Sequence, residues 1–271
     1  MRTSHNKSQI ITLIYVIIAY SITWIILFPL STVYNELNLI QREVWHSLGS
    51  IGPTVGGILA LYLLKRKEGL KLLKDRMLKY SGKKLLLFAF SPMVILVITL
   101  LMESILGLFN IVSFFQENNI LSFGSLIVFI LPSICYGFFE EIGWRGYFLP
   151  SLQEKFNALI STIILTVIWW FWHFPTFFYR SDLFFGFVLL FPLMLSGSIV
   201  ITYLFNQSKG SILMVIFLHI SYDLVTSHQI SITALIIVST FYVFMDIRIL
   251  KIYGIENFST LDRITLELNN N

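Results

Sequence analysis

The stretch LIVFILPSICYGFFEEIGWRGYF, residues 126–148, places two adjacent glutamates and one arginine inside an otherwise apolar run. A run of about 20 apolar residues is long enough to cross the hydrocarbon core of a bilayer as a helix. An ionisable side chain within such a helix costs about 2.5–3.5 kcal/mol on insertion scales and usually marks a functional site. Glu140, Glu141 and Arg145 are therefore the first residues whose presence needs an explanation.

The composition of the whole chain agrees with a membrane location. Of its 271 residues, 56% are hydrophobic and 13% are charged, whereas a soluble domain carries about 25% charged residues. Apolar runs recur from end to end, which predicts an all-α, polytopic membrane helix bundle in a single integral domain, residues 1–271, with its motif-bearing core at about 122–227. About eight spans are expected, at roughly 9–30, 45–64, 84–108, 122–148, 158–179, 183–205, 210–227 and 229–248.

Lys and Arg residues are distributed unequally between the two sides of this predicted topology. Sixteen of the nineteen fall on the side that holds both termini, whereas only Arg42 and Arg180 fall on the other side. Cytoplasmic loops of membrane proteins are enriched in these cations, so both termini are expected in the cytoplasm. The compact chain favours a bacterial host and hence its plasma membrane. The loop bias accounts for the net charge of +4, and no nucleic-acid partner is expected.

Eight ionisable groups fall within the predicted spans: Glu103, Glu140, Glu141, Arg145, His173, His219, Asp223 and Asp246. Glu103 and Asp246 lie near predicted helix ends, and we expect both at a solvated rim. The other six lie on three helices and are expected to converge in the bundle core. The alternative is a purely structural polar network that holds the three helices together.

Helical spacing predicts different partners for the two glutamates. Residues four apart share a helix face, so Glu141 is expected to pair with Arg145, and His219 to face Asp223. Glu140 is rotated by about 100° from Glu141 and is left to face another group. Gly137 and Gly143 would let neighbouring helices approach closely at this point.

Three motifs resemble those of the CPBP intramembrane proteases, the family of the type II CAAX prenyl proteases and bacterial Abi proteins. Glu-Glu-x-x-x-Arg stands here as Glu140, Glu141 and Arg145, Phe-x-x-x-His as Trp169 and His173, and His-x-x-x-Asn/Asp as His219 and Asp223. They cover about residues 137–226, and their order and spacing fit the family.

The resemblance implies hydrolysis of a peptide bond in a membrane-associated protein or peptide. It implies that Glu140 and His173 activate water, that His219 and Asp223 stabilise the oxyanion, and that Glu141 and Arg145 support the site. Two positions depart from the commonest pattern. Trp169 in place of Phe is expected to change packing only. An ionised Asp223 cannot donate a hydrogen bond, so it would serve the oxyanion directly only if protonated, and otherwise it could orient His219.

The sequence leaves open whether the site uses a metal ion and whether the protein is an enzyme. Zinc, with Glu140, His173 and His219 as candidate ligands, is the alternative to metal-independent glutamate chemistry, and we expect no obligatory cofactor. The rival functions are a non-catalytic membrane regulator or bacteriocin-immunity protein on the same scaffold, and a proton-coupled transporter. The transporter reading is weakened because the sequence has no detectable inverted repeat.

Overall fold

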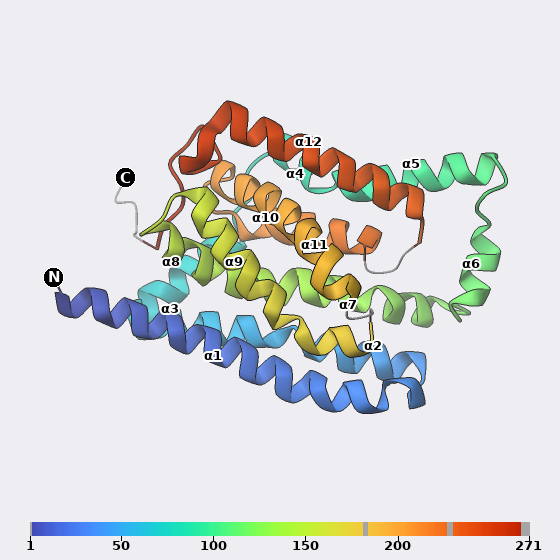
Figure 1. The fold of residues 1–271 in the computed structure, drawn as a ribbon, viewed down its shortest axis with the longest axis horizontal. Helices are drawn as coiled ribbons and strands as arrows, with labels where there is room; N and C mark the ends of the chain where they lie inside the picture. Colours follow the sequence, from blue (N-terminus) through green and yellow to red (C-terminus); the bar gives the residue numbers. More distant parts are fainter. Residues whose placement is uncertain (1, 181–183, 227–229, 267–271) are drawn as a thin grey trace.

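The computed structural model is a bundle of α-helices, and it describes residues 2–180, 184–226 and 230–266 (Figure 1). No strand occurs in these ranges. The helices are α1 Arg2–Val33, α2 Leu39–Leu48, α3 Ile51–Met77, α4 Lys83–Ala89, α5 Ser91–Ile105, α6 Ile111–Glu117, α7 Phe123–Gly143, α8 Leu149–Gln153, α9 Ala158–Trp172, α10 Leu190–Gln207, α11 Ile212–Thr226 and α12 Ile232–Asn257. The predicted all-α polytopic bundle is thus confirmed.

The lengths of the helices limit how many of them can span a membrane. Within the described ranges, five helical stretches are long and apolar enough to cross a membrane: Lys7–Glu36, Leu39–Met77, Phe123–Gln153, Leu190–Gln207 and Ile232–Asn257. The α4–α5 pair, bent by 54°, would make a sixth. Helices α9 and α11 have only 15 residues each, so the count of eight stays a prediction. The boundaries placed at residues 183, 227 and 229 lie outside the described residues.

Helix α7 packs between α3 on one side and α11 on the other. Two glycines allow this close approach. A Cβ atom added at Gly143 would lie 2.3 Å from the backbone oxygen of Pro53 on α3, and one at Gly137 would lie 2.9 Å from the backbone nitrogen of Ile220 on α11. Since real Cβ atoms do not come this close to backbone, the expectation for both glycines is confirmed.

Local signals set where the site-bearing helices begin and end. Ser122 caps α7 by accepting a hydrogen bond from the backbone of Ser125, as N-cap serines commonly do. Just after the two glutamates, α7 continues into a π-helical turn, η2 (Trp144–Phe148), a feature frequent at functional sites. Helix α9 ends at Trp172 because Pro175 follows closely, so His173 lies at its C-terminal cap.

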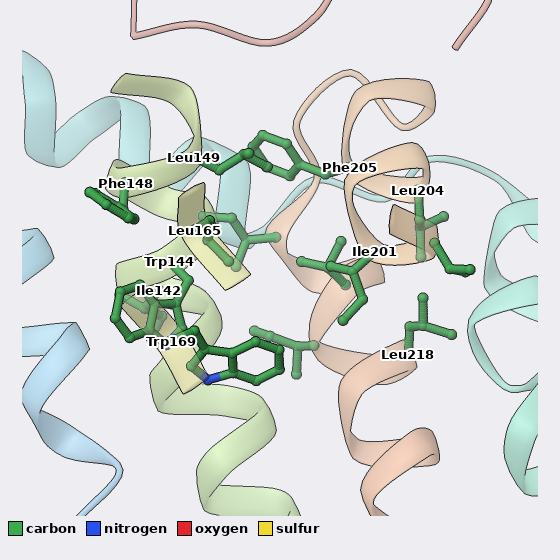
Figure 2. Packing of buried hydrophobic residues seen from close by; sticks show 14 of the residues in the cluster. Ile142, Trp144, Phe148, Leu149, Leu165, Trp169, Ile201, Leu204, Phe205 and Leu218 are labelled. Atoms are coloured by element: carbon green, nitrogen blue, oxygen red, sulfur yellow. The ribbon is translucent and has the colours of Figure 1, made fainter. Parts of the chain in front are cut away.

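The apolar core continues from the π-helical turn toward the end of the bundle where α8 begins. Figure 2 shows Trp144, Phe148 and Leu149 from this turn and the start of α8, with Leu165 and Trp169 of α9 and Ile201 and Phe205 of α10. All seven are buried. The polar groups near Glu140 are therefore backed by a continuous apolar layer.

The expected rim position of Asp246 is wrong. Helix α12 runs on to Asn257, so Asp246 lies in its interior and not at its end. Its Oδ2 accepts a hydrogen bond from Ser196 at 2.5 Å. The predicted span ended at Arg248, but α12 continues through this residue.

Candidate active site

Three helices bring the predicted site residues to one cavity of about 480 Å³. Glu140 comes from α7, His173 from the cap of α9, and His219 and Asp223 from α11. All four line the cavity, as does Trp169. Glu141 and Arg145 lie behind them, and both are fully buried.

The two carboxylate oxygens of Glu140 have different surroundings: one accepts hydrogen bonds from two indole groups, and the other faces His173. Its Oε2 accepts hydrogen bonds from the indole N–H of Trp144, at 3.2 Å, and of Trp169. Its Oε1 has no hydrogen-bond partner among the described residues and lies 3.9 Å from Nε2 of His173. The carboxylate is thus fixed in orientation, and its second oxygen is buried without a hydrogen bond to any described residue.

The ring of His173 is oriented by its own helix. Its Nδ1 lies 2.9 Å from the backbone oxygen of Trp169. A carbonyl oxygen only accepts hydrogen bonds, so Nδ1 carries the proton. In the neutral ring, Nε2 is then left with a lone pair that faces Glu140.

Glu141 connects two helices through a single oxygen. Its Oε1 accepts a hydrogen bond from Nη1 of Arg145 at 2.8 Å, so the predicted salt bridge is present. The same oxygen lies 2.7 Å from Nδ1 of His219 on α11, a contact that the sequence did not predict. Arg145 also lies over the ring of Trp169, 5.3 Å from its centre.

His219 lies between two carboxylates. Glu141 contacts its Nδ1, and Oδ1 of Asp223 lies 3.6 Å from its Nε2. This second distance is too long for a direct hydrogen bond. Asp223 faces the cavity and is more exposed than His219, at 18% against 4% of the side chain.

The expectation that Trp169 changes packing only is wrong. Its indole N–H donates to Glu140, which a Phe at this position could not do. Trp144 was missed altogether, although it lies four residues after Glu140. The spacing argument that paired Glu141 with Arg145, applied to Glu140, would have found it.

A second polar group lines the outer part of the same cavity, and local sequence gave no sign of it. His46 of α2 contacts the hydroxyl of Tyr179 at 2.7 Å through Nδ1, and Arg180 pairs with Glu43. These partners are more than 130 residues apart in the sequence. Only the fold brings α2 against the segment that follows α9.

The candidate zinc ligands do not form a metal site as they stand. Among the described residues, no three His, Cys, Asp or Glu side chains come together in a way that could hold a metal ion. Nδ1 of His219 is bonded to Glu141, and its Nε2 faces Asp223. Glu140 and His173 present Oε1 and Nε2 to each other across 3.9 Å, so zinc dependence stays an open alternative to metal-independent chemistry.

Two comparisons with known proteins bear on this arrangement. Residues 121–225 match the family model described as type II CAAX prenyl endopeptidase Rce1-like. All seven residues of the three motifs lie within this range. Residues 121–225 are therefore similar to the CAAX protease (CPBP) family.

A curated relative agrees with this assignment. The CAAX prenyl protease 2 of Methanococcus maripaludis is 27% identical over 179 residues, which are 60% of this chain. The alignment covers 65% of that protein, slightly less than two thirds of its length. The match over residues 121–225 and the apolar helices together indicate an integral membrane protein with a region similar to this family.

Proposed function

We propose that this chain is an intramembrane endopeptidase, which hydrolyses a peptide bond in a membrane-associated protein or peptide. The proposal rests on how the carboxylate of Glu140 is hydrogen-bonded and on what faces its second oxygen. Two indole groups fix one of its oxygens, and the other faces Nε2 of His173 across 3.9 Å inside a cavity. A gap of this size between two polar groups is one that a water molecule can bridge.

In the proposed reaction, the water donates hydrogen bonds to Oε1 of Glu140 and to Nε2 of His173. Its oxygen attacks the carbonyl carbon of the scissile bond as its proton passes to Glu140, which acts as the general base. The resulting tetrahedral intermediate carries the negative charge on the former carbonyl oxygen. Glu140 then returns the proton to the leaving nitrogen, and the C–N bond breaks.

His219 is the proposed donor to the oxyanion, through Nε2. For this atom to donate while Nδ1 donates to Glu141, both ring nitrogens must carry protons. Glu141 and Asp223 are the carboxylates that face this imidazolium from its two sides. Preorganised donors of this kind stabilise developing charge strongly in a cavity that excludes water.

The cavity has a size and lining that suit a short peptide segment. Its volume of about 480 Å³ lies within the usual range for ligand sites. Beyond the catalytic groups, its wall is largely apolar and includes Leu190, Leu193 and Met194 of α10. We therefore propose an apolar stretch of substrate next to the scissile bond.

The test compares the peptides in the membrane fraction of cells that carry wild-type protein or the Glu140→Gln variant. A precursor should accumulate and its fragments should disappear in the variant. The matched control is Glu117→Gln, since Glu117 is exposed at the end of α6, away from the cavity. Identical peptide profiles for wild type and Glu140→Gln would argue against proteolysis and for a non-catalytic regulator.

A further inference from the structure

We infer that the cavity opens toward the extracytoplasmic face of the membrane, so its substrate is a peptide or protein that arrives from that side. That the cavity receives a substrate rests on the proposed function, whereas the direction in which the cavity opens does not. Two observations indicate this direction: the position of the cavity along the helices, and the unequal distribution of Lys and Arg between the two ends of the bundle.

The cavity extends from Glu140 toward only one end of the bundle. On most of the elements that line it, the residues beyond Glu140, His173 and His219 lie in the same direction. They are Pro132, Ser133 and Tyr136 before Glu140 on α7, Thr176 and Arg180 after His173, Asp223 and Thr226 after His219 on α11, Leu235 near the start of α12, and His46 on α2. Helix α10 lines the side of the cavity from Leu190 to Ile201. On α7 the lining ends at Glu140, and no described residue of η2 or α8 lines the cavity.

Exposure rises in the same direction. The side chain of Glu140 is fully buried, and that of His219 is 4% exposed. His173 reaches 17%, Asp223 18% and Arg180 28%. The gradient shows that the cavity meets the outside of the bundle near Arg180.

The other end is closed by packed side chains. Directly after Glu141, the π-helical turn carries Trp144 and Arg145, both with no exposed surface, and then Phe148, which is 1% exposed. The apolar layer in Figure 2 continues this seal through Leu149 and Phe205. A substrate could not approach Glu140 from this side without displacing the core.

The closed end is the cation-rich end. Figure 1 shows the start of α1 and the end of α12 at one end of the bundle, and α2 with the turn between α6 and α7 at the other. Sixteen of the nineteen Lys and Arg residues fall toward the end with the termini, nine of them from Lys65 to Lys84. The open end has Arg42 and Arg180 alone, and Arg180 is paired with Glu43.

The positive-inside rule therefore assigns the closed end to the cytoplasm and the open end to the outside. A protein held on the cytoplasmic leaflet would meet the sealed end. The substrate class that fits is a translocated or secreted peptide, or the extracytoplasmic end of a membrane protein.

Thiol labelling in intact cells tests this direction without any need for catalysis. In a Cys135→Ala background, which removes the one native thiol, single cysteines are introduced as Gln116→Cys, Thr226→Cys and Lys155→Cys. Gln116 and Lys155 are exposed at the open and closed ends, and Thr226 lines the cavity near its mouth. A membrane-impermeant maleimide should label Gln116→Cys and Thr226→Cys in intact cells, and Lys155→Cys only after permeabilisation.

Two results would overturn the inference. Labelling of Lys155→Cys with protection of the other two would reverse the orientation. Labelling of Gln116→Cys with Thr226→Cys protected, even after permeabilisation, would show that the cavity does not open at this end. Because labelling needs no turnover, a failure of the protease proposal would leave these results unchanged, and the two failures can be told apart.

Discussion

Oε1 of Glu141 lies 2.7 Å from Nδ1 of His219, and this contact joins α7 to α11 inside the bundle. The same oxygen accepts a hydrogen bond from Arg145. One buried carboxylate thus holds the cation of its own helix and the imidazole of another. Glu140, its neighbour in sequence, contacts neither group and faces the cavity.

Loss of either member of the Glu141–Arg145 pair is expected to damage the fold. Glu141→Gln leaves Arg145 as a buried charge without its counter-ion, and Arg145→Ala does the same to Glu141. Breaking a buried pair in this way generally costs about 3–5 kcal/mol. Thermal unfolding of the purified variants in detergent measures the loss, with Glu117→Gln as the control. Variants as stable as wild type would contradict the structural role of the pair.

Trp169→Phe tests whether the indole positions Glu140. The variant keeps an aromatic ring but removes one of two hydrogen bonds to the carboxylate. A hydrogen bond to a charged group contributes about 1.5–3 kcal/mol, so kcat should fall roughly 10- to 100-fold, with KM little changed.

The matched control for that variant is Trp45→Phe. It also removes an indole hydrogen bond, but one to the backbone oxygen of Ile26. Equal losses of kcat in the two variants would show a general packing defect and not positioning of Glu140.

Asp223→Asn distinguishes two roles for this residue. If the side chain aids the oxyanion, the amide should serve well, because it always carries N–H donors. We expect the variant to keep substantial activity, since the family motif commonly has Asn here. If the carboxylate is needed to orient His219, turnover should instead drop by about 10- to 100-fold.

Metal dependence is tested by stripping the purified protein with a chelator and assaying it before and after. We expect activity to stay largely intact, because Glu140 and His173 can activate water through proton transfer. Loss of activity that zinc alone restores would contradict this, and would require Glu140, His173 and His219 to rearrange into a ligand set.

Spacing along single helices predicted much of this site. The pairing of Glu141 with Arg145 and the close approach at Gly137 and Gly143 followed from helix geometry and residue size. The contact of Trp144 with Glu140 was missed although the same spacing argument could have found it. The other missed contacts join different elements: Glu141 with His219, Trp169 with Glu140, and His46 with Tyr179. Such contacts depend on how helices cross, which a local pattern does not contain.

Helix ends were harder to predict than helices. Asp246 was assigned to a rim because cations follow it, yet α12 continues past them to Asn257. The span expected at 158–179, by contrast, ended too late, because α9 stops at Trp172, just before Pro175. Proline gives a physical end signal, whereas a charged residue can extend a helix from the membrane into water. The single-domain organisation and the count of eight spans stay predictions.

The central claim is that Glu140 activates the water that cleaves the peptide bond. Its most direct test is single-turnover cleavage of a membrane peptide by purified protein in vesicles, comparing wild type with Glu140→Gln. The amide cannot take the proton, so the rate should fall by about 10²–10⁴-fold, while the unfolding temperature stays near that of wild type. Near wild-type cleavage by a folded Glu140→Gln protein would contradict the account.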